Sequence, residues 1–372
     1  MEFPEEVLAY IFSYLPLWDR YSASLVCKAW SQTMTHPSVW YYTEVRCESG
    51  TEAHGLLQFC QLLRLVRHLK ISVRHLKEEA SRNMAVQVLN HATVRDSCLS
   101  ALCVSCTGDF PLFYSGEDIL RSIEAVLLSE ESGLSLREVD FRDMPFTLSD
   151  SLIRNVARRS PGLRRLYINN QTLVCNITTH TMREVLTLCP ELRVLGVFYA
   201  SLSETVLGEL LHPQRPPFSL LELYCEWSDK YVPTVSDRFW ETLRRRHPSL
   251  SVDVVLNHTL PVTKFLKILQ PGVPVRGLEL VTYTYLVKEV AFAADSYSGT
   301  LEKLVLQTTS SPELDSALVG VAERCGLLRE VHCYCVVSQH VVRAFVTGCP
   351  RLWRYTLKTY KEPHPWTCTV LK

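Results

Sequence analysis

The sequence predicts an α/β fold: a short N-terminal helical module followed by a curved solenoid, with strands on the concave side and helices on the convex side. The main observation is a short motif that recurs along most of the chain, with apolar residues at its first, fourth and sixth positions. Amphipathic helical stretches separate the copies. The 372 residues exceed what one hydrophobic core usually organises, which favours two parts or an extended repeat array.

The first forty residues predict the helical module. Apolar residues at helical spacing predict two helices, over Phe3–Leu15 and Asp19–Thr33. Pro4 suits the first turn of the first helix, Pro16 ends it, and Asp19 is expected to cap the second. Segments below about 40 residues rarely bury so many large side chains alone. We therefore expect the module to cover part of its apolar surface with a partner.

From about residue 56 onward the chain repeats. The copies of the motif, given by their first, fourth and sixth residues, are Val66-Leu69-Ile71, Leu99-Leu102-Val104, Leu136-Val139-Phe141, Leu163-Leu166-Ile168, Leu192-Leu195-Val197, Leu220-Leu223-Cys225, Val275-Leu278-Leu280, Leu301-Leu304-Leu306, Leu328-Val331-Cys333 and Leu352-Tyr355-Leu357. A weaker copy lies near Leu250, where Asp253 falls at the middle apolar position and leaves the register open. The later copies recur at or near the roughly 20–29 residues of leucine-rich repeats, whereas the earlier copies are spaced more widely.

Helices are predicted between the strands. They are expected over residues 150–159, 181–188, 236–246, 313–324 and 338–347. Ser149, Ser236 and Ser338 lie where three of these helices begin and are the expected N-caps. Prolines follow four of the helical stretches and mark the turn to the next strand: Pro161, Pro190, Pro248 and Pro350. Each repeat is thus a strand, a turn and a helix, and stacking of neighbouring repeats makes the core.

The N-terminal segment resembles an F-box. The resemblance is carried by Phe3-Pro4-Glu5-Glu6-Val7-Leu8, Ile11-Phe12-Ser13-Tyr14-Leu15-Pro16, Asp19-Arg20, Val26-Cys27-Lys28-Ala29-Trp30 and Trp40. Phe3 departs from the family pattern, which usually has leucine there, but it keeps an apolar side chain. The alternative is an ordinary helical hairpin. The repeats resemble the cysteine-containing type of leucine-rich repeat, so nearly the whole chain resembles the F-box/leucine-rich-repeat family.

This resemblance implies a non-catalytic substrate-recognition subunit of an SCF-type (cullin-RING) E3 ubiquitin ligase. The F-box, residues 1–45, would bind the S-phase kinase-associated linker protein and, through it, a cullin scaffold with its RING subunit. The repeats, residues 56–372 with a C-terminal cap around Tyr355 and Trp366, would hold an unknown protein substrate for ubiquitination and degradation. The competing interpretation is a leucine-rich-repeat interaction or inhibitor protein that acts without ubiquitin ligase assembly.

Two sets of residues are candidate contact sites. The F-box resemblance implies a linker-binding set, which comprises Phe3, Pro4, Glu5, Val7, Leu8, Ile11, Phe12, Leu15, Val26 and Trp30. Strand alternation points the third, fifth and seventh motif positions away from the core. The substrate-binding set comes from these positions and comprises Arg165, Tyr167, Asn169, Phe198, Tyr224, Glu226, His332 and Tyr334. Exposed aromatic side chains beside charges are typical of protein interfaces. The alternative is that some of these rings lie flat and only cover the strands.

The composition argues against several other functions. The formal net charge is zero, with 39 basic and 39 acidic residues, so no global charge favours nucleic acid or an anionic membrane. No apolar run approaches the roughly 18 residues of a membrane span, and the N-terminus does not resemble a secretory signal. The 14 cysteines are scattered within apolar patterns, which predicts reduced thiols in a cytoplasmic or nuclear protein. The basic run Arg244-Arg245-Arg246 is expected at a helix C-terminus, where the dipole favours cations; nucleic-acid binding is the alternative.

No sequence motif predicts catalysis, a cofactor or a metal site. Cys103 and Cys106 have a metal-like spacing, but no second ligand pair follows at a finger-like distance. Cys333 and Cys335 are expected to share one strand face, with Cys333 packed in the core. The sequence contains no glycine-rich phosphate loop and no GxSxG motif. An enzyme with its own catalytic cysteine is a third interpretation, although nothing pairs a cysteine with a base.

Overall fold

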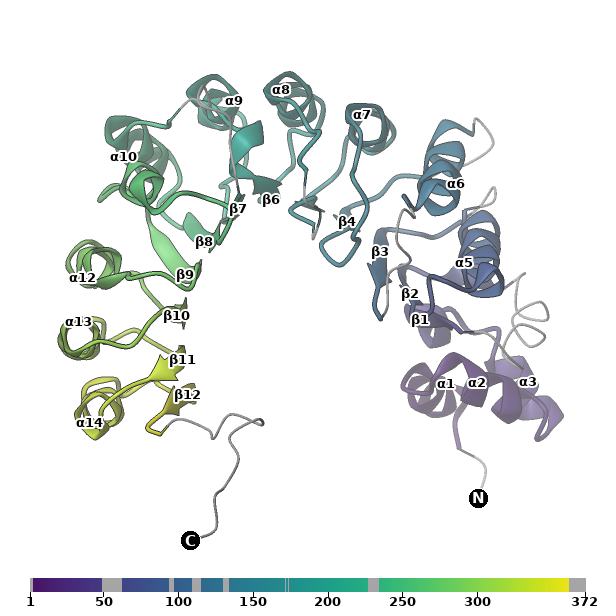
Figure 1. Cartoon of the computed structure of the whole chain (residues 1–372). Helices are drawn as coiled ribbons and strands as arrows, with labels where there is room; N and C mark the ends of the chain where they lie inside the picture. Colours follow the sequence, from purple (N-terminus) through teal and green to yellow (C-terminus); the bar gives the residue numbers. More distant parts are fainter. Residues whose placement is uncertain are drawn as a thin grey trace, which may run out of the picture. The chain divides into compact units, whose positions relative to one another are not determined.

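Strands and helices alternate along the chain after an N-terminal helical module (Figure 1). The computed structural model describes residues 3–48, 62–93, 97–108, 115–129, 134–170, 172, 174–226 and 234–360. The chain divides into two compact units. The first comprises Met1–Val197 and Thr205–Pro216, and the second comprises Phe198–Glu204 and Pro217–Lys372.

The first unit contains the helical module and the first six strands. Its α-helices are α1 (Glu5–Ser13), α2 (Leu17–Ser24), α3 (Lys28–Thr33), α5 (Glu79–Ala92), α6 (Glu117–Leu128), α7 (Asp150–Arg159), α8 (Thr179–Leu188) and most of α9 (Glu204–Gly208). Its short 3₁₀ helices are η1 (Pro37–Trp40), η2 (Leu63–Leu65) and η4 (Glu209–Leu211). Its strands are β1 (Tyr42–Cys47), β2 (His68–Val73), β3 (Ala101–Cys106), β4 (Glu138–Asp140), β5 (Arg165–Tyr167) and most of β6 (Val194–Phe198).

These six strands pair in parallel and in chain order. The register aligns equivalent motif positions, so Leu69 pairs with Leu102, Leu102 with Val139, and Val139 with Leu166. All four side chains are buried. The helices lie on the side of the strands to which these residues point, and the opposite side of the strands is left open (Figure 1). We call this open side the strand face.

The second unit repeats the same arrangement. Its helices are η3 (Tyr199–Ser201), α10 (Asp237–Arg246), η5 (Val262–Lys264), α11 (Phe265–Ile268), α12 (Val287–Ser296), α13 (Pro312–Arg324) and α14 (Gln339–Gly348). Its strands are β7 (Leu220–Cys225), β8 (Ser251–Asn257), β9 (Val275–Val281), β10 (Lys303–Gln307), β11 (Glu330–Val336) and β12 (Arg354–Lys358), again parallel and in chain order. The predicted α/β architecture of a helical module followed by strand–helix repeats is confirmed.

The structure gives the register that the sequence left open near Asp253, and Asp253 does not occupy a core position. In β8 the core-facing residues are Val254 and Leu256, which pair with Leu278 and Leu280 of β9. Asp253 points to the strand face and accepts a hydrogen bond of 3.0 Å from Nε of Arg276. An irregularity between Val252 and Asp253 shifts the register, which is why a regular motif could not be fitted by spacing alone.

The second helix of the module is broken, contrary to the prediction. α2 ends at Ser24 and α3 begins at Lys28, because Cys27 adopts an extended backbone conformation with φ −160° and ψ 167°. Asp19 does not cap a helix, since it lies inside α2. Pro16 occupies the cap position instead, and its ψ of 156° leads directly into the first turn. The apolar residues keep helical spacing on both sides of this break. Their spacing alone therefore could not reveal that the helix is interrupted.

The helices of the repeats begin and end close to the predicted residues. Ser149 caps α7, with its hydroxyl oxygen accepting a hydrogen bond of 3.2 Å from the backbone N–H of Leu152. Ser236 and Ser338 also occupy N-cap positions, but neither side chain makes the capping hydrogen bond. The hydroxyl group of Ser236 instead donates to the carboxylate of Glu204 at 2.5 Å. The predicted cap positions are thus confirmed, whereas the capping contact is confirmed only at Ser149.

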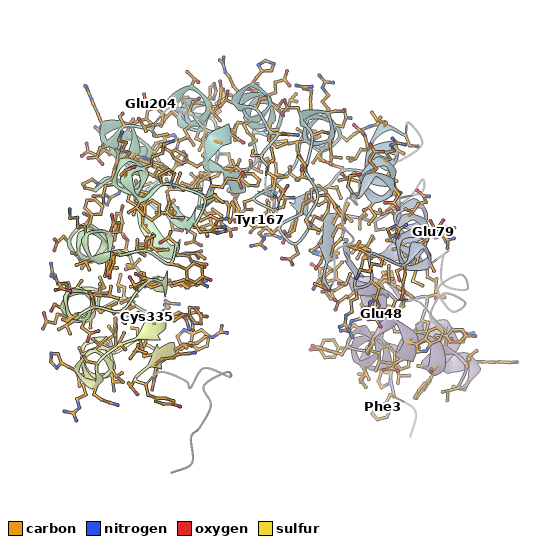
Figure 2. All side chains as sticks on the ribbon, viewed as in Figure 1. Phe3, Glu48, Glu79, Tyr167, Glu204 and Cys335 are labelled. Carbon is orange, nitrogen blue, oxygen red and sulfur yellow. The ribbon has the colours of Figure 1, made fainter. Side chains whose placement is uncertain are left out.

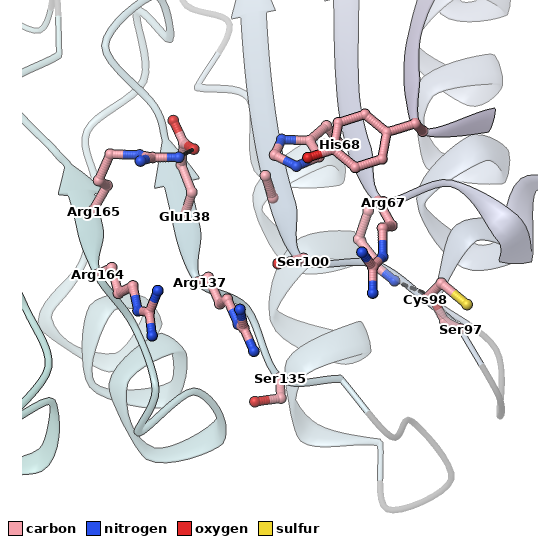
Figure 3. Close-up of a pocket in the computed structure, with 13 residues that line it drawn as sticks. Arg67, His68, Ser97, Cys98, Ser100, Ser135, Arg137, Glu138, Arg164 and Arg165 are labelled. Carbon is pink, nitrogen blue, oxygen red and sulfur yellow. Dashed lines mark hydrogen bonds and ion pairs between the residues drawn. The ribbon is translucent and has the colours of Figure 1, made fainter. Parts of the chain in front are cut away.

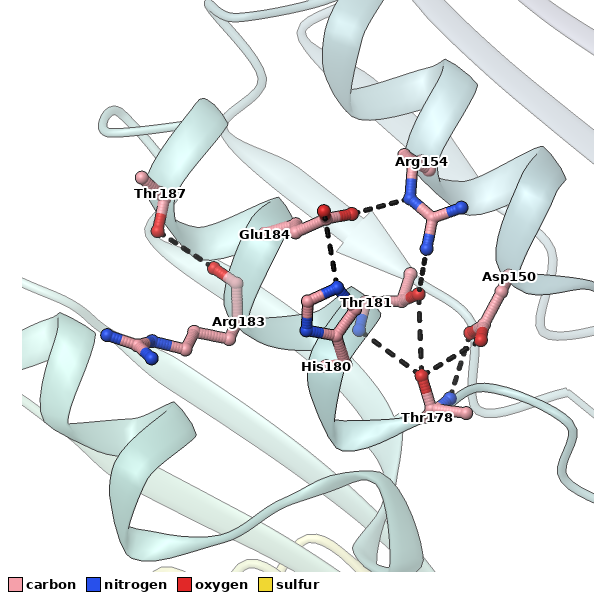
Figure 4. Close-up of polar contacts among 8 residues, drawn as sticks. All are labelled: Asp150, Arg154, Thr178, His180, Thr181, Arg183, Glu184 and Thr187. Atoms are coloured by element: carbon pink, nitrogen blue, oxygen red, sulfur yellow. Dashed lines mark hydrogen bonds and ion pairs between the residues drawn. The ribbon is translucent and has the colours of Figure 1, made fainter.

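Neighbouring helices are joined by side-chain contacts that fix their register, as between α7 and α8 (Figure 4). The carboxylate of Asp150 accepts hydrogen bonds from the backbone N–H and the hydroxyl group of Thr178, at 2.9 and 2.8 Å. Arg154 donates to Thr181 at 3.0 Å and to Glu184, and the second bond lowers the pKa of the Glu184 carboxyl group. These contacts tie the start of one repeat helix to the next.

The two ends of the described chain differ from the regular repeats. β1 was not predicted as a copy of the motif, yet it pairs with β2 over its whole length and buries Thr43 and Val45. It crosses residue 45, where the F-box was expected to end, and the predicted repeat start at residue 56 lies outside the described residues. At the other end Tyr355 lies in β12 with 52% of its surface exposed, and Trp366 lies outside the described residues.

Candidate functional site

The helical module has a small core of its own. On α1 the buried side chains are Ala9 and Phe12, and the ring of Phe12 packs edge-on against Trp30 of α3 with 5.1 Å between centroids. Trp40 of η1 is fully buried, and its indole N–H donates a hydrogen bond of 2.7 Å to the backbone carbonyl of Met34. One face of α1 therefore packs inside the module.

Arg20 joins the module to the first strand. It is 3% exposed, and its guanidinium group donates to the carbonyl oxygens of Ser13, Leu15 and Tyr42 and to the hydroxyl oxygen of Thr43, at 2.9–3.1 Å. The guanidinium carbon also lies 5.4 Å from the centroid of a Trp40 ring. Burial lowers the pKa of Arg20 to about 10, so the side chain stays charged at neutral pH. This residue holds α1, α2 and β1 together.

The opposite face of α1 exposes large apolar side chains. Val7, Ile11 and Tyr14 recur at helical spacing and are 42%, 46% and 70% exposed. Near them in the chain Phe3 and Tyr10 are also exposed, and Leu25 and Val26 are exposed where α2 meets α3. We call these seven residues the apolar face of the module; Figure 2 labels Phe3. Monomeric soluble proteins rarely expose apolar residues in such a concentration unless another molecule covers them.

The structure divides the predicted linker-binding set into three groups. Its exposed members are Phe3, Pro4, Glu5, Val7, Ile11 and Val26. Leu8, Leu15 and Trp30 are half-buried. Phe12 is 2% exposed, so it supports the fold of the module. The assignment of this set to linker binding stays a prediction.

The predicted linker-binding set omits four aromatic residues of the module, of which Tyr10, Tyr14 and Trp18 are exposed and Tyr21 is half-buried. Tyr10 and Tyr14 lie edge to face at 5.1 Å, and their hydroxyl groups are 2.6 Å apart. Trp18 and Tyr21 of α2 stack with centroids 5.5 Å apart. Their spacing of three or four residues was a usable signal, because side chains at that spacing lie on the same side of a helix. In the sequence, Arg20 is only one of the residues that carry the F-box resemblance. Its position among the neighbouring residues did not indicate that its charge is buried.

The strand face of the first unit is dominated by charged and aromatic contacts. Arg165 forms an ion pair with Glu138 of the neighbouring strand, and this hydrogen bond raises the pKa of Arg165. The guanidinium group of Arg142 lies over the ring of Tyr167, 3.9 Å from its centroid, and also binds the carboxylate of Asp140 at 2.7 Å. Tyr167 is consequently only 8% exposed. Asn169, which is half-buried, covers the space beside Gly196.

Three expected contact residues in the second unit are poorly accessible. Phe198 was expected on the exposed surface, but it is 1% exposed and meets Tyr224 edge to face at 5.6 Å. Tyr224 is half-buried and accepts a hydrogen bond of 2.5 Å from the Asn257 side chain. Glu226 is 9% exposed. These side chains point away from the core, as the alternation predicted. Large neighbours on the same face nevertheless cover one another, so the prediction that Phe198 is exposed was wrong.

Further along the second unit, the strand face is more accessible. His332 accepts or donates a hydrogen bond of 3.0 Å with Thr356 of the next strand, and its ring stacks on Tyr334 at 6.4 Å. Tyr334 is 50% exposed. These two residues line a shallow cavity of about 390 Å³ together with Glu279, Lys303 and other residues of β9–β12. They remain predicted substrate contacts.

The chain is similar to known proteins, both in the helical module and over nearly its whole length. The F-box-like family model matches residues 2–43. F-box/LRR-repeat protein 8 of Homo sapiens is 40% identical over 369 residues, which cover 99% of this chain and 98% of that protein. The chain therefore belongs to the F-box/LRR-repeat protein family. F-box/LRR-repeat protein 8 of Bos taurus is 41% identical over 371 residues, covering 100% and 98%. F-box/LRR-repeat protein 21 of Mus musculus is 24% identical over 368 residues, covering 94% and 80%.

Membership of the F-box/LRR-repeat family implies an adaptor. Burial raises the pKa values of Cys103 and Cys106 to about 12, which keeps both thiols protonated and poorly nucleophilic. The sulfurs of Cys333 and Cys335 lie 3.4 Å apart, and the hydrogen bond between them raises the pKa of the buried Cys333 and lowers the pKa of Cys335. Within the described ranges no group of three or more potential metal ligands comes together. None of the helices in these ranges has the length and apolar character that a bilayer crossing requires.

Proposed function

We propose that this F-box/LRR-repeat chain is the substrate-recognition subunit of an SCF-type E3 ubiquitin ligase. The apolar face of the module binds the S-phase kinase-associated linker protein, which connects the chain to a cullin and its RING subunit. The repeats bind a protein substrate through the strand face. The observation that supports this proposal most strongly is the exposure of Val7, Ile11 and Tyr14 on one side of α1, in a segment that matches the F-box-like family.

The energetics of the module favour a partner at this place. Burying an exposed side chain such as valine or isoleucine contributes on the order of 25 cal/mol per Å² of apolar surface. Phe3, Val7, Ile11, Leu25 and Val26 are each between 42% and 67% exposed, so about half of that contribution is not realised by the chain alone. The core of the module is complete without them, since Phe12 and Trp30 pack on the other side of α1. A partner can therefore cover the apolar face without any rearrangement of the module.

The function needs no acid, base or metal from this chain. A substrate held on the repeats is kept near the conjugating enzyme, and a raised effective concentration of its lysines accelerates transfer of ubiquitin. We place this activity in the cytoplasm or the nucleus. The support is that all cysteines of the described residues are free thiols, as in reducing compartments.

The double substitution Val7→Asp and Ile11→Asp tests the proposed contact. Both side chains are already exposed, so the module should still fold, but two carboxylates in an apolar interface would each lose their hydration. We expect binding to the immobilised linker protein to weaken by about 100-fold or more. The measurement is a titration of purified chain in a pull-down or by biolayer interferometry.

A matched control is offered by Leu266→Asp with Val346→Asp. These side chains are 44% and 58% exposed, lie on helices of the second unit, and receive the same change of charge. The control should bind the linker like the unchanged chain. Equal binding by the Val7 and Ile11 variant and the unchanged chain would show that the apolar face is not the contact.

A further inference from the structure

Two cysteines of the second unit lie side by side near the end of β11. The sulfurs of Cys333 and Cys335 are 3.4 Å apart, within hydrogen-bond distance. Side chains two residues apart in a strand point to the same side, so both thiols lie on the side of β11 that faces the helices. Figure 2 labels Cys335 on this strand. The strand itself therefore brings the two sulfurs together, without a contribution from a distant segment.

The two thiols differ in their access to solvent. Cys333 is fully buried at an apolar core position of its repeat, whereas Cys335 is only half-buried. The hydrogen bond from Cys333 lowers the pKa of the Cys335 thiol, against the opposing effect of burial, and the same bond raises the pKa of Cys333. A half-exposed thiol that loses its proton readily, beside a second thiol, is the arrangement of an attacking and a resolving cysteine.

Other neighbouring cysteines are arranged differently. The thiol of Cys349 donates to the carbonyl oxygens of Ala322 and Cys325, at 3.5 and 3.9 Å, so its partners are backbone oxygens and not a second sulfur. A metal site at Cys333 and Cys335 is not indicated, because no third potential ligand joins them among the residues that the structure describes. The contact between their sulfurs therefore points to chemistry of the thiols themselves.

The backbone between the two cysteines is not fixed by the neighbouring strands. Pairing of β11 with β10 ends at Cys333, and pairing with β12 passes from Cys333 directly to Val336. Among the described residues, Tyr334 and Cys335 thus have no partner in either register. Two residues of an extended strand span about 6.4–6.8 Å, whereas the Cα atoms of a disulfide are most often about 5.5–6 Å apart. A bond between the two sulfurs therefore requires the strand to bend at Tyr334, where the pairing permits it.

We propose that Cys333 and Cys335 form an oxidisable dithiol, which a hydroperoxide such as hydrogen peroxide converts to a disulfide. The Cys335 sulfur attacks one peroxide oxygen, so that an S–O bond forms while the O–O bond breaks. The hydroxide that leaves takes up the proton released by the Cys335 thiol and becomes water. The Cys333 sulfur then attacks the Cys335 sulfur, and the hydroxide of the sulfenic acid leaves with the Cys333 proton as a second water. The two sulfurs lose two electrons, which reduce the peroxide.

Tyr334 connects this dithiol to the strand face. It lies between the two cysteines and points to the opposite side of β11, where it is 50% exposed and stacks on His332 at 6.4 Å. His332 in turn shares a hydrogen bond of 3.0 Å with Thr356 of β12. Bending β11 at Tyr334 moves its ring away from His332 and reshapes the shallow cavity that both residues line. Oxidation thereby regulates substrate binding at this part of the strand face, a consequence that rests on the proposed function of the repeats.

The test oxidises the purified full chain with graded hydrogen peroxide, alkylates the remaining thiols and digests the chain with trypsin. Cleavage after Arg329 and Arg343 releases a peptide whose only cysteines are Cys333 and Cys335. We expect mass spectrometry to find this peptide unalkylated and lighter by two hydrogen atoms, and dithiothreitol to reverse the change. Because the Cys335 thiol loses its proton more readily, half conversion should need about tenfold less peroxide than oxidation of the exposed Cys27.

Two substitutions separate the roles of the thiols. Cys335→Ser removes the half-exposed thiol and should leave Cys333 reduced. Cys333→Ala keeps a small apolar side chain in the core, and Cys335 should then stop at the sulfenic acid, which dimedone traps. The matched control Cys27→Ser should form the disulfide like the unchanged chain. Peroxide should speed hydrogen exchange over β11 in the unchanged chain and in this control, but not in Cys335→Ser.

Three results would overturn the proposal. The peptide could stay reduced at the peroxide concentration that oxidises Cys27, the control Cys27→Ser could lose the disulfide as Cys335→Ser does, or Cys335 could oxidise irreversibly without a bond to Cys333. A disulfide that forms without faster exchange over β11 would contradict the displacement of Tyr334. The disulfide is measured without linker or substrate. Failure here would therefore leave the proposed ligase role standing, and failure of linker binding would leave the dithiol standing.

Discussion

Replacing Arg20 by methionine is expected to detach the helical module from the first strand. Methionine retains the aliphatic volume but leaves three carbonyl oxygens and the Thr43 hydroxyl group without their buried donor. An unsatisfied buried polar group costs about 1–3 kcal/mol, so the local free energy of opening should fall by about 3 kcal/mol or more. Hydrogen exchange measured by mass spectrometry should show faster exchange over α1–α3 and β1, with no change over α12–α14.

The control is Arg46→Met on the same strand. Arg46 is an exposed side chain whose ion pair with Glu44, at 3.6 Å, lies at the surface and should contribute about 1 kcal/mol at most. Its exchange pattern should resemble that of the unchanged chain. If Arg20→Met left the exchange of α1–α3 unaltered, the module would be held to the strand by something other than this buried guanidinium group.

The second large effect is expected from Trp240→Ala in α10. Trp240 is 2% exposed and is among the largest fully buried side chains of the described residues. Removing a buried tryptophan side chain typically destabilises a protein by about 3–5 kcal/mol, through lost burial and the cavity that remains. Because each repeat contacts mainly its neighbours, the loss should be concentrated around α10, β8 and β9. Urea denaturation combined with hydrogen exchange would measure both its size and its location.

Trp353→Ala is the matched control, since it makes the same chemical change at a residue that is 68% exposed. We expect its midpoint of urea denaturation to stay near that of the unchanged chain, because surface substitutions usually change stability by about 0.5 kcal/mol or less. Comparable destabilisation by both substitutions would contradict the packing described for α10.

The periodic features of the fold were predictable because each depends on local spacing. The motif positions of Leu166, Leu195 and Leu278 are buried as expected, and α7 has the predicted bounds Asp150–Arg159. Prolines such as Pro161 and Pro190 follow the helices, where a missing N–H and a fixed φ end helical structure. The F-box was recognisable for a related reason, since its landmarks fall within forty consecutive residues.

The remaining features depend on contacts between residues that are distant in the chain. Phe198 is buried because Tyr224 of another strand lies against it, and no spacing within either strand reveals this contact. Arg67, Arg137 and Arg164 are far apart in the chain, and only the ladder of strands brings them to the lining of one pocket (Figure 3). Arg20 is buried where the backbone carbonyl oxygens of Ser13, Leu15 and Tyr42, from two segments of the chain, surround its guanidinium group. Contacts of this kind arise only when the chain is folded, and no pattern of neighbouring residues predicts them.

We propose that the apolar face of the F-box module is the binding surface for the linker protein. Co-expression of the chain with the S-phase kinase-associated linker protein, followed by gel filtration, tests this claim most directly. We expect a stable one-to-one complex, and aggregation when the chain is expressed alone, because Val7, Ile11 and Val26 would remain uncovered. A soluble monomer that elutes apart from the linker would contradict the claim, and with it the ubiquitin ligase role.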